Sequence, residues 1–146
     1  MGTNPTSLSI IDEEHREIER AAVEMMNAIV LGSAQDSLTT ASNELVRVTS
    51  KHFENEEAML KRIHFAELAQ HVRAHKKMSA KLQQLRDKIE VRETSAAFHL
   101  MREFRTMLQR HLQDEDEHYR DPLNQLAAEH GAEPLPPRIR RMGMNT

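Results

Sequence analysis

Apolar residues recur along most of the chain at alternating steps of three and four residues, and this pattern pauses three times. The stripes cover residues 8–29, 38–63, 68–89 and 97–111. Such spacing places the apolar side chains on one face of an α-helix, so each stripe predicts an amphipathic helix. Because the pauses are short, consecutive helices should run antiparallel. We therefore expect an all-α protein, an up-down-up-down four-helix bundle.

Residues that favour helix ends stand at the pauses. Gly32 suits the C-terminal end of the first helix, because glycine adopts the left-handed conformation that commonly closes a helix. Asp36 or Ser37 is expected to cap the start of the second helix, and Thr94 or Ser95 the start of the fourth.

The apolar pattern weakens after Tyr119. A short C-terminal helix can begin at Asp121-Pro122 and end at Gly131. We assign residues 1–130 to the bundle and residues 131–146 to an extended, basic, proline-rich tail or linker. Such a segment either covers the end of the bundle or connects it to a signalling partner or a fused effector domain.

Each stripe also contains histidine at a position where leucine or isoleucine is expected. In an antiparallel hairpin, residues equidistant from the turn lie side by side. By this rule His15 pairs with His52 across the first pause, His52 with His75 across the second, and His75 with His111 across the third. Glu56 and His71 pair across the second pause as well. The sequence therefore predicts one layer of histidine and carboxylate inside the bundle.

The carboxylate contributed by the fourth helix is ambiguous. Glu115 follows His111 by four residues and would share its helix face, whereas Asp116 follows by five and points about 140° away. A locally widened turn would bring Asp116 back to the layer. Helix geometry leaves both residues open.

A buried cluster of five imidazoles and two carboxylates would be costly unless each polar group were paired, and a metal ion does this. The chain of 146 residues has no cysteine, so only nitrogen and oxygen donors are available. These favour iron, manganese or zinc over copper(I) or an iron–sulfur cluster. The net charge of −3 gives no reason to expect nucleic acid or a membrane surface as a partner. No apolar run is long enough to span a membrane. The polar N-terminus is unlike a secretory signal, so we expect a cytoplasmic protein.

Four motifs resemble those of the hemerythrin family, particularly the bacterial hemerythrins. They are Ile11-Asp12-Glu13-Glu14-His15, His52-Phe53-x-x-Glu56-Glu57, His71-x-x-x-His75 and His111-x-x-x-x-Asp116. The resemblance extends over roughly residues 8–120. In that family the last motif is histidine followed five residues later by aspartate, which favours Asp116 over Glu115.

The resemblance implies a centre of two iron ions joined by an oxo or hydroxo group. One iron would be bound by His71, His75 and His111, and the other by His15 and His52, with one position left open. Glu56 and Asp116 would bridge the two ions, and Leu108 matches a position near the O₂ pocket. The implied function is reversible O₂ binding for transport, storage or delivery, with no catalytic residues and no enzyme activity.

Three other functions compete with this one. The same centre could serve an O₂ or redox sensor that signals through the C-terminal tail. A ferritin-like di-iron oxidase would need two Glu-x-x-His motifs and two further glutamates, whereas the motif occurs here at Glu115–His118 and the predicted ligands are mostly histidine. A metal-free helical interaction module would leave the histidine layer unexplained.

Overall fold

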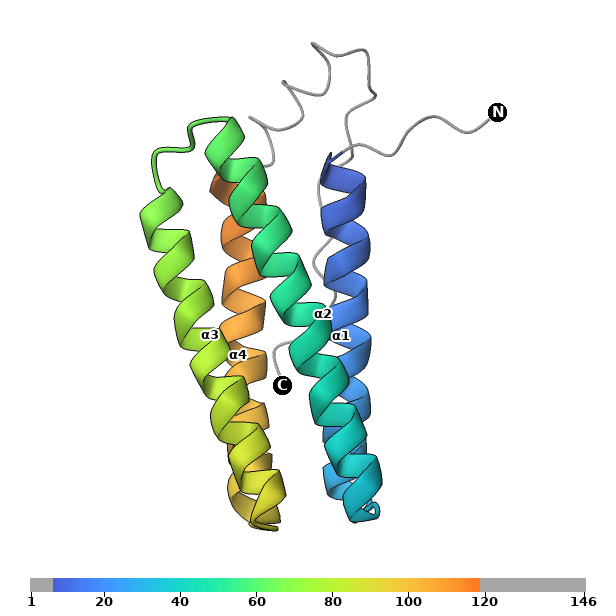
Figure 1. The fold of residues 1–146 in the computed structure, drawn as a ribbon. Coiled ribbons are helices and arrows are strands. Elements are labelled where there is room, and N and C mark those ends of the chain that lie inside the picture. The colour runs from blue at the N-terminus through green and yellow to red at the C-terminus, as the bar shows by residue number, and fades with distance from the viewer. Residues whose placement is uncertain (1–6, 119–146) are drawn as a thin grey trace, which may run out of the picture.

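The computed structural model describes the backbone of residues 7–118 and the side chains of residues 9–114. It contains α1 (Ser7–Val30), α2 (Gln35–Arg62), α3 (Leu68–Glu90) and α4 (Thr94–His118), which alternate in direction as Figure 1 shows. Each helix packs against the next in the chain, and α4 also packs against α1, which closes the ring. The predicted antiparallel four-helix bundle is confirmed. The short C-terminal helix and the tail expected beyond Tyr119 lie outside the described residues.

The apolar stripes meet in two unequal clusters. The larger cluster includes Ile18, Leu45, Leu82 and Phe104, all almost completely buried. The smaller one consists of Ile11, Met59 and Leu60, close to the turn between α2 and α3. Within the described residues, no helix is both long and apolar enough to cross a membrane.

The helices α1, α2 and α3 all end in the same backbone motif. The second residue after the end of each helix has a positive φ, namely Gly32 (65°), His64 (54°) and Arg92 (62°). The next amide donates to a carbonyl five residues back, with Ser33 bonded to Ala28 at 3.0 Å, Phe65 to Leu60 at 3.0 Å and Glu93 to Lys88 at 2.9 Å. This is the Schellman arrangement, which satisfies carbonyls that the last turn leaves open. Glycine was expected there for α1, but α2 and α3 use histidine and arginine.

The predicted N-terminal caps are wrong by one to three residues. Ala34 precedes α2 in an extended conformation without a side-chain cap, so Asp36 lies in the first helical turn. The amide of Ala97 donates to the carbonyl of Glu93, which places Thr94 inside α4 rather than at its cap. The turns after α1 and α3 are so short that the next helix begins at once. Both α2 and α4 therefore start before the polar residue that was expected to cap them.

Candidate metal centre

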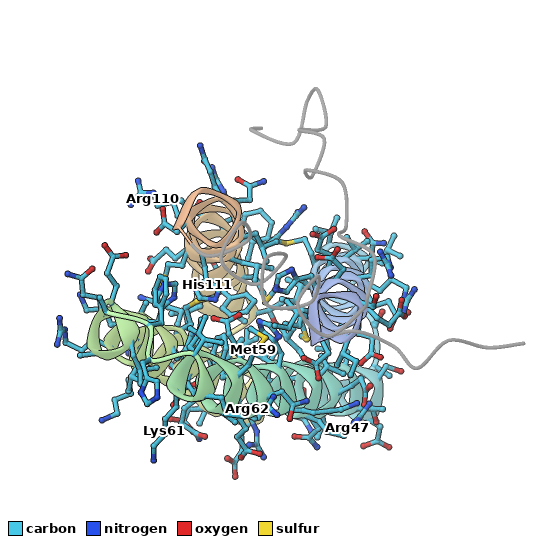
Figure 2. All side chains as sticks on the ribbon, turned by 90° about the horizontal axis from the view of Figure 1, so that it is seen from above. Arg47, Met59, Lys61, Arg62, Arg110 and His111 are labelled. Carbon is cyan, nitrogen blue, oxygen red and sulfur yellow. The ribbon has the colours of Figure 1, made fainter. Side chains whose placement is uncertain are left out.

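Six of the seven predicted ligands converge in one layer between the two apolar clusters. All six residues are at most 7% exposed, and they come from all four helices: His15 (α1), His52 and Glu56 (α2), His71 and His75 (α3) and His111 (α4). Seen along the bundle, His111 points between the helices whereas its neighbour Arg110 points outward (Figure 2). The backbone of Asp116 belongs to α4, but its side chain lies outside the described residues, so its role stays a prediction.

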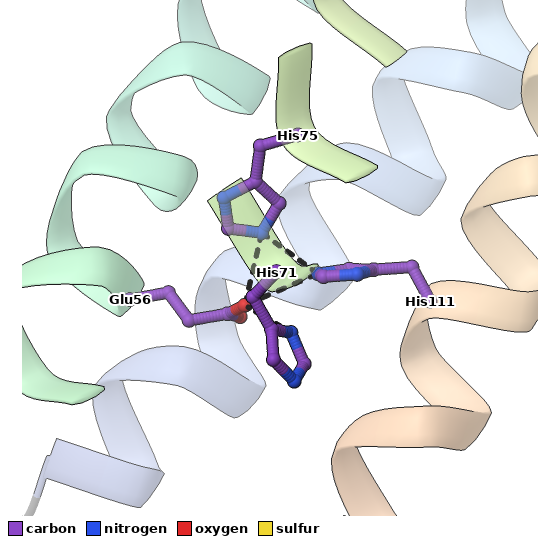
Figure 3. Close-up of side chains that lie close together, drawn as sticks. All are labelled: Glu56, His71, His75 and His111. Atoms are coloured by element: carbon purple, nitrogen blue, oxygen red, sulfur yellow. Dashed lines mark hydrogen bonds and ion pairs between the residues drawn. The ribbon is translucent and has the colours of Figure 1, made fainter. Parts of the chain in front are cut away.

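Glu56 divides this layer into two groups of donors. Its Oε2 lies 2.8 Å from His52 Nε2, and that histidine lies 3.1 Å from His15 Nε2. Its Oε1 lies 3.0 Å from His75 Nε2 and 3.2 Å from His111 Nε2. His71 joins the second group through Nδ1, 3.9 Å from the same oxygen (Figure 3). Each group brings its donor atoms within 4.8 Å of one another, and Glu56 is the member they share.

Two histidines of the layer are held from behind by carboxylates. His52 Nδ1 lies 3.1 Å from Glu14 Oε1, and His75 Nδ1 lies 2.7 Å from Glu57 Oε2. The second oxygen of Glu14 accepts a hydrogen bond from Asn55 Nδ2 at 2.5 Å. Sequence reasoning assigned no role to these three residues. A signal was present for Glu14, because the turn symmetry that pairs His15 with His52 also places Glu14 level with Phe53, between His52 and Asn55.

This arrangement fits a metal cation. A carboxylate accepts a hydrogen bond from each Nδ1–H, and in a neutral imidazole the other ring nitrogen, Nε2, then carries a lone pair. For both His52 and His75, that lone pair faces an oxygen of Glu56, so acceptors face one another in a buried site. Only protons or a shared cation can relieve this opposition. A carboxylate behind a histidine that faces inward is also the usual support of a histidine metal ligand.

Comparisons with known proteins agree with this chemistry. The family model described as the hemerythrin HHE cation binding domain matches residues 6–132. The chain belongs to the hemerythrin family. It is 30% identical over 136 residues to a bacteriohemerythrin of Stenotrophomonas maltophilia (strain R551-3), an alignment that covers 84% of this chain and 82% of that protein. No solved structure matches the chain.

Aromatic rings pack against the histidines of this hemerythrin-family site. Phe53 stacks on His75 with ring centres 4.0 Å apart and planes 8° apart, and Phe65 meets the edge of His71 at 5.5 Å. Phe53 is itself buried. Rings held by such packing keep their orientation, and the apolar surface around them limits the access of water.

A groove between α3 and α4 reaches the layer from outside. It encloses about 350 Å³, and its lining includes Arg73, Met78, Arg110 and His111. The candidate ligand His111, only 5% exposed, thus lies at the inner side of this groove.

The remaining sequence assignments concern residues around the layer. Leu108 is buried within the larger apolar cluster, and its place beside an O₂ pocket stays a prediction. His64 and His99, which belong to none of the four motifs, are exposed.

Proposed function

We propose that this chain binds O₂ reversibly at a non-heme di-iron centre, as an oxygen carrier, store or delivery protein rather than an enzyme. Three histidines, His71, His75 and His111, would bind one iron. His15 and His52 would bind the other and leave a position open for O₂. Glu56 and Asp116 would bridge the two ions.

The observation that carries the proposal is the position of Glu56. Its two oxygens face different histidine groups, Oε2 toward His52 and Oε1 toward His75 and His111. A carboxylate in this position suits a bridge between two metal ions, because each oxygen can bind one of them. A single-metal site would need no such division. Family membership supports iron as the metal.

The inequality of the two histidine groups supports O₂ binding. When bound, the iron pair would supply the electrons that O₂ takes up on binding. The side chains would hold the two ions at different coordination, since one group has three histidines and the other has two. The carboxylates and an oxo or hydroxo bridge would offset most of the positive charge, which a helical interior requires. The buried rings around the layer exclude the water and protons that would displace bound O₂.

The test is a visible absorption spectrum of the iron-loaded, anaerobically reduced protein before and after exposure to air. We expect about two iron ions per chain and an absorption band that appears with O₂ and disappears under argon over repeated cycles. Immediate conversion to a stable ferric spectrum would refute reversible binding and favour a redox sensor. A single iron per chain would refute the dinuclear centre.

Variants test the ligand assignment. Glu56→Gln should abolish binding of the second iron, because an amide is a poor bridge between cations. Glu54→Gln, an exposed position on the same helix, is the matched control and should bind iron normally.

The fourth helix needs a separate pair of variants. Asp116→Asn should reduce iron stoichiometry whereas Glu115→Gln should not, and the reverse result would transfer the bridge to Glu115.

A further inference from the structure

The two histidines that are supported from behind have very different surroundings. Glu57, behind His75, is 35% exposed and reaches solvent. Glu14, behind His52, is only 3% exposed. Both oxygens of Glu14 have partners, one facing His52 Nδ1 at 3.1 Å and the other accepting from Asn55 Nδ2 at 2.5 Å. Asn55 lies on the exposed side of α2, three residues after His52.

We propose that Asn55 is a positioning residue for the two-histidine half of the centre, acting through Glu14 on His52. The proposal rests on the proposed function only in requiring that His52 binds a metal. Asn55 anchors the Glu14 carboxylate across the α1–α2 interface. Glu14 then holds the proton of His52 on Nδ1 and directs Nε2 toward the metal.

The buried position makes this support specific to one half of the centre. A carboxylate removed from water interacts strongly with the few partners it has, because the local dielectric constant is low. Burial therefore strengthens the effect of Glu14 on His52, whereas Glu57, although closer to its histidine at 2.7 Å than Glu14 at 3.1 Å, is partly screened by solvent. This compensates the half of the centre that has one histidine fewer. Without the Asn55 amide, one buried oxygen of Glu14 would lose its hydrogen-bond donor, which is costly. The carboxylate would therefore rotate toward solvent and away from His52.

The test is a titration of each purified protein with Co²⁺, followed by visible absorption in competition with a chelator. His15→Ala identifies which binding step belongs to the two-histidine group. Glu14→Gln should weaken that step by about 10- to 100-fold, the usual effect of removing an outer partner of a ligand. Glu57→Gln should instead weaken the other step.

Asn55 is tested by two substitutions. Asn55→Ala should weaken the two-histidine step by about tenfold, at the lower end of such effects. Asn55→Asp, nearly identical in shape, should weaken it further because a second carboxylate would face Glu14. Asn43→Ala, an exposed asparagine on the same helix, is the matched control. In the metal-free protein, where no cation fixes the tautomer, ¹⁵N chemical shifts of His52 should report a smaller share of the Nδ1–H form in the Asn55 variants.

The Co²⁺ binding constants of the Asn55 variants decide whether the proposal holds. A loss confined to the two-histidine step, larger for Asn55→Asp than for Asn55→Ala, supports the proposal. Unchanged constants in both Asn55 variants, or equal weakening of both steps, overturn it. Failure of the protein to bind O₂ would refute the proposed function without changing these Co²⁺ constants, so the two failures are distinguishable.

Discussion

Replacing Arg92 by glycine should stabilise the protein. Arg92 has a φ of 62°, a conformation that costs a residue with a side chain about 1–2 kcal/mol. Glycine avoids this cost but loses about 0.5–1 kcal/mol through the greater freedom of the unfolded chain. Arg92 is exposed, and its backbone bond to Ile89 at 3.1 Å is kept in the variant. The net gain should be about 0.75 kcal/mol, the difference between the midpoints of the two effects.

Two further variants, Gly32→Ala and Val91→Gly, should destabilise the protein for the same backbone reasons. At Gly32, with φ of 65°, an added Cβ would meet nothing within 4 Å, so Gly32→Ala should cost about 1 kcal/mol through backbone conformation alone. Val91 precedes Arg92 with an ordinary φ of −87° and is 61% exposed, so Val91→Gly should destabilise by about 0.5–1 kcal/mol.

The assay is urea unfolding followed by circular dichroism at one fixed Zn²⁺ concentration, so that metal binding contributes equally to all variants. The reasoning fails if Arg92→Gly is neutral or destabilising like Val91→Gly. It also fails if Gly32→Ala is harmless.

Three other predictions concern charge, core and access. A hydrogen bond from Lys81 Nζ, 2.5 Å away, lowers the pKa of the Glu103 carboxyl. The stability that this ion pair contributes is present above the ordinary pKa of a glutamate and is lost as pH falls through the lowered pKa of Glu103. Glu103→Gln should therefore flatten the acid side of a plot of urea midpoint against pH. Leu45→Ala should reduce the free energy of unfolding by about 2–5 kcal/mol, since Leu45 is fully buried; a smaller loss in urea unfolding would argue against tight packing there. Ala74→Phe should partly fill the groove beside His111 and slow metal removal by EDTA, and an unchanged stripping rate would mean that the chelator enters elsewhere.

The sequence predicted the bundle well because the information it required is local and periodic. Four apolar stripes separated by short pauses leave few other ways to bury the chain. The helix ends were less predictable. His64 and Arg92 adopt a conformation that glycine favours, and residue type is a weak guide to it: histidine is enriched there among non-glycine residues, but arginine is not. They do so because the next helix must pack back on the bundle, and packing outweighs the small local cost at each turn.

The histidine layer was predictable because turn symmetry converts sequence positions into neighbours. The same symmetry places Glu14 at the level of Phe53, between His52 and Asn55, yet it could not show which of these neighbours the carboxylate contacts. The division of the layer into two groups depends on which way each oxygen of Glu56 points. That direction follows from side-chain packing among four helices, and the periodicity of the sequence does not predict it.

The sequence by itself therefore determined the fold class, the level of the site and six donors that meet there, since these follow from helix period and hairpin symmetry. Tertiary structure alone decided that Glu56 faces both groups and that Asn55 anchors a buried Glu14. It also decided that a groove between α3 and α4 reaches His111. The physical reason is that period and symmetry act along the chain, whereas side-chain direction, burial and hydrogen-bond partners arise only when the helices pack together.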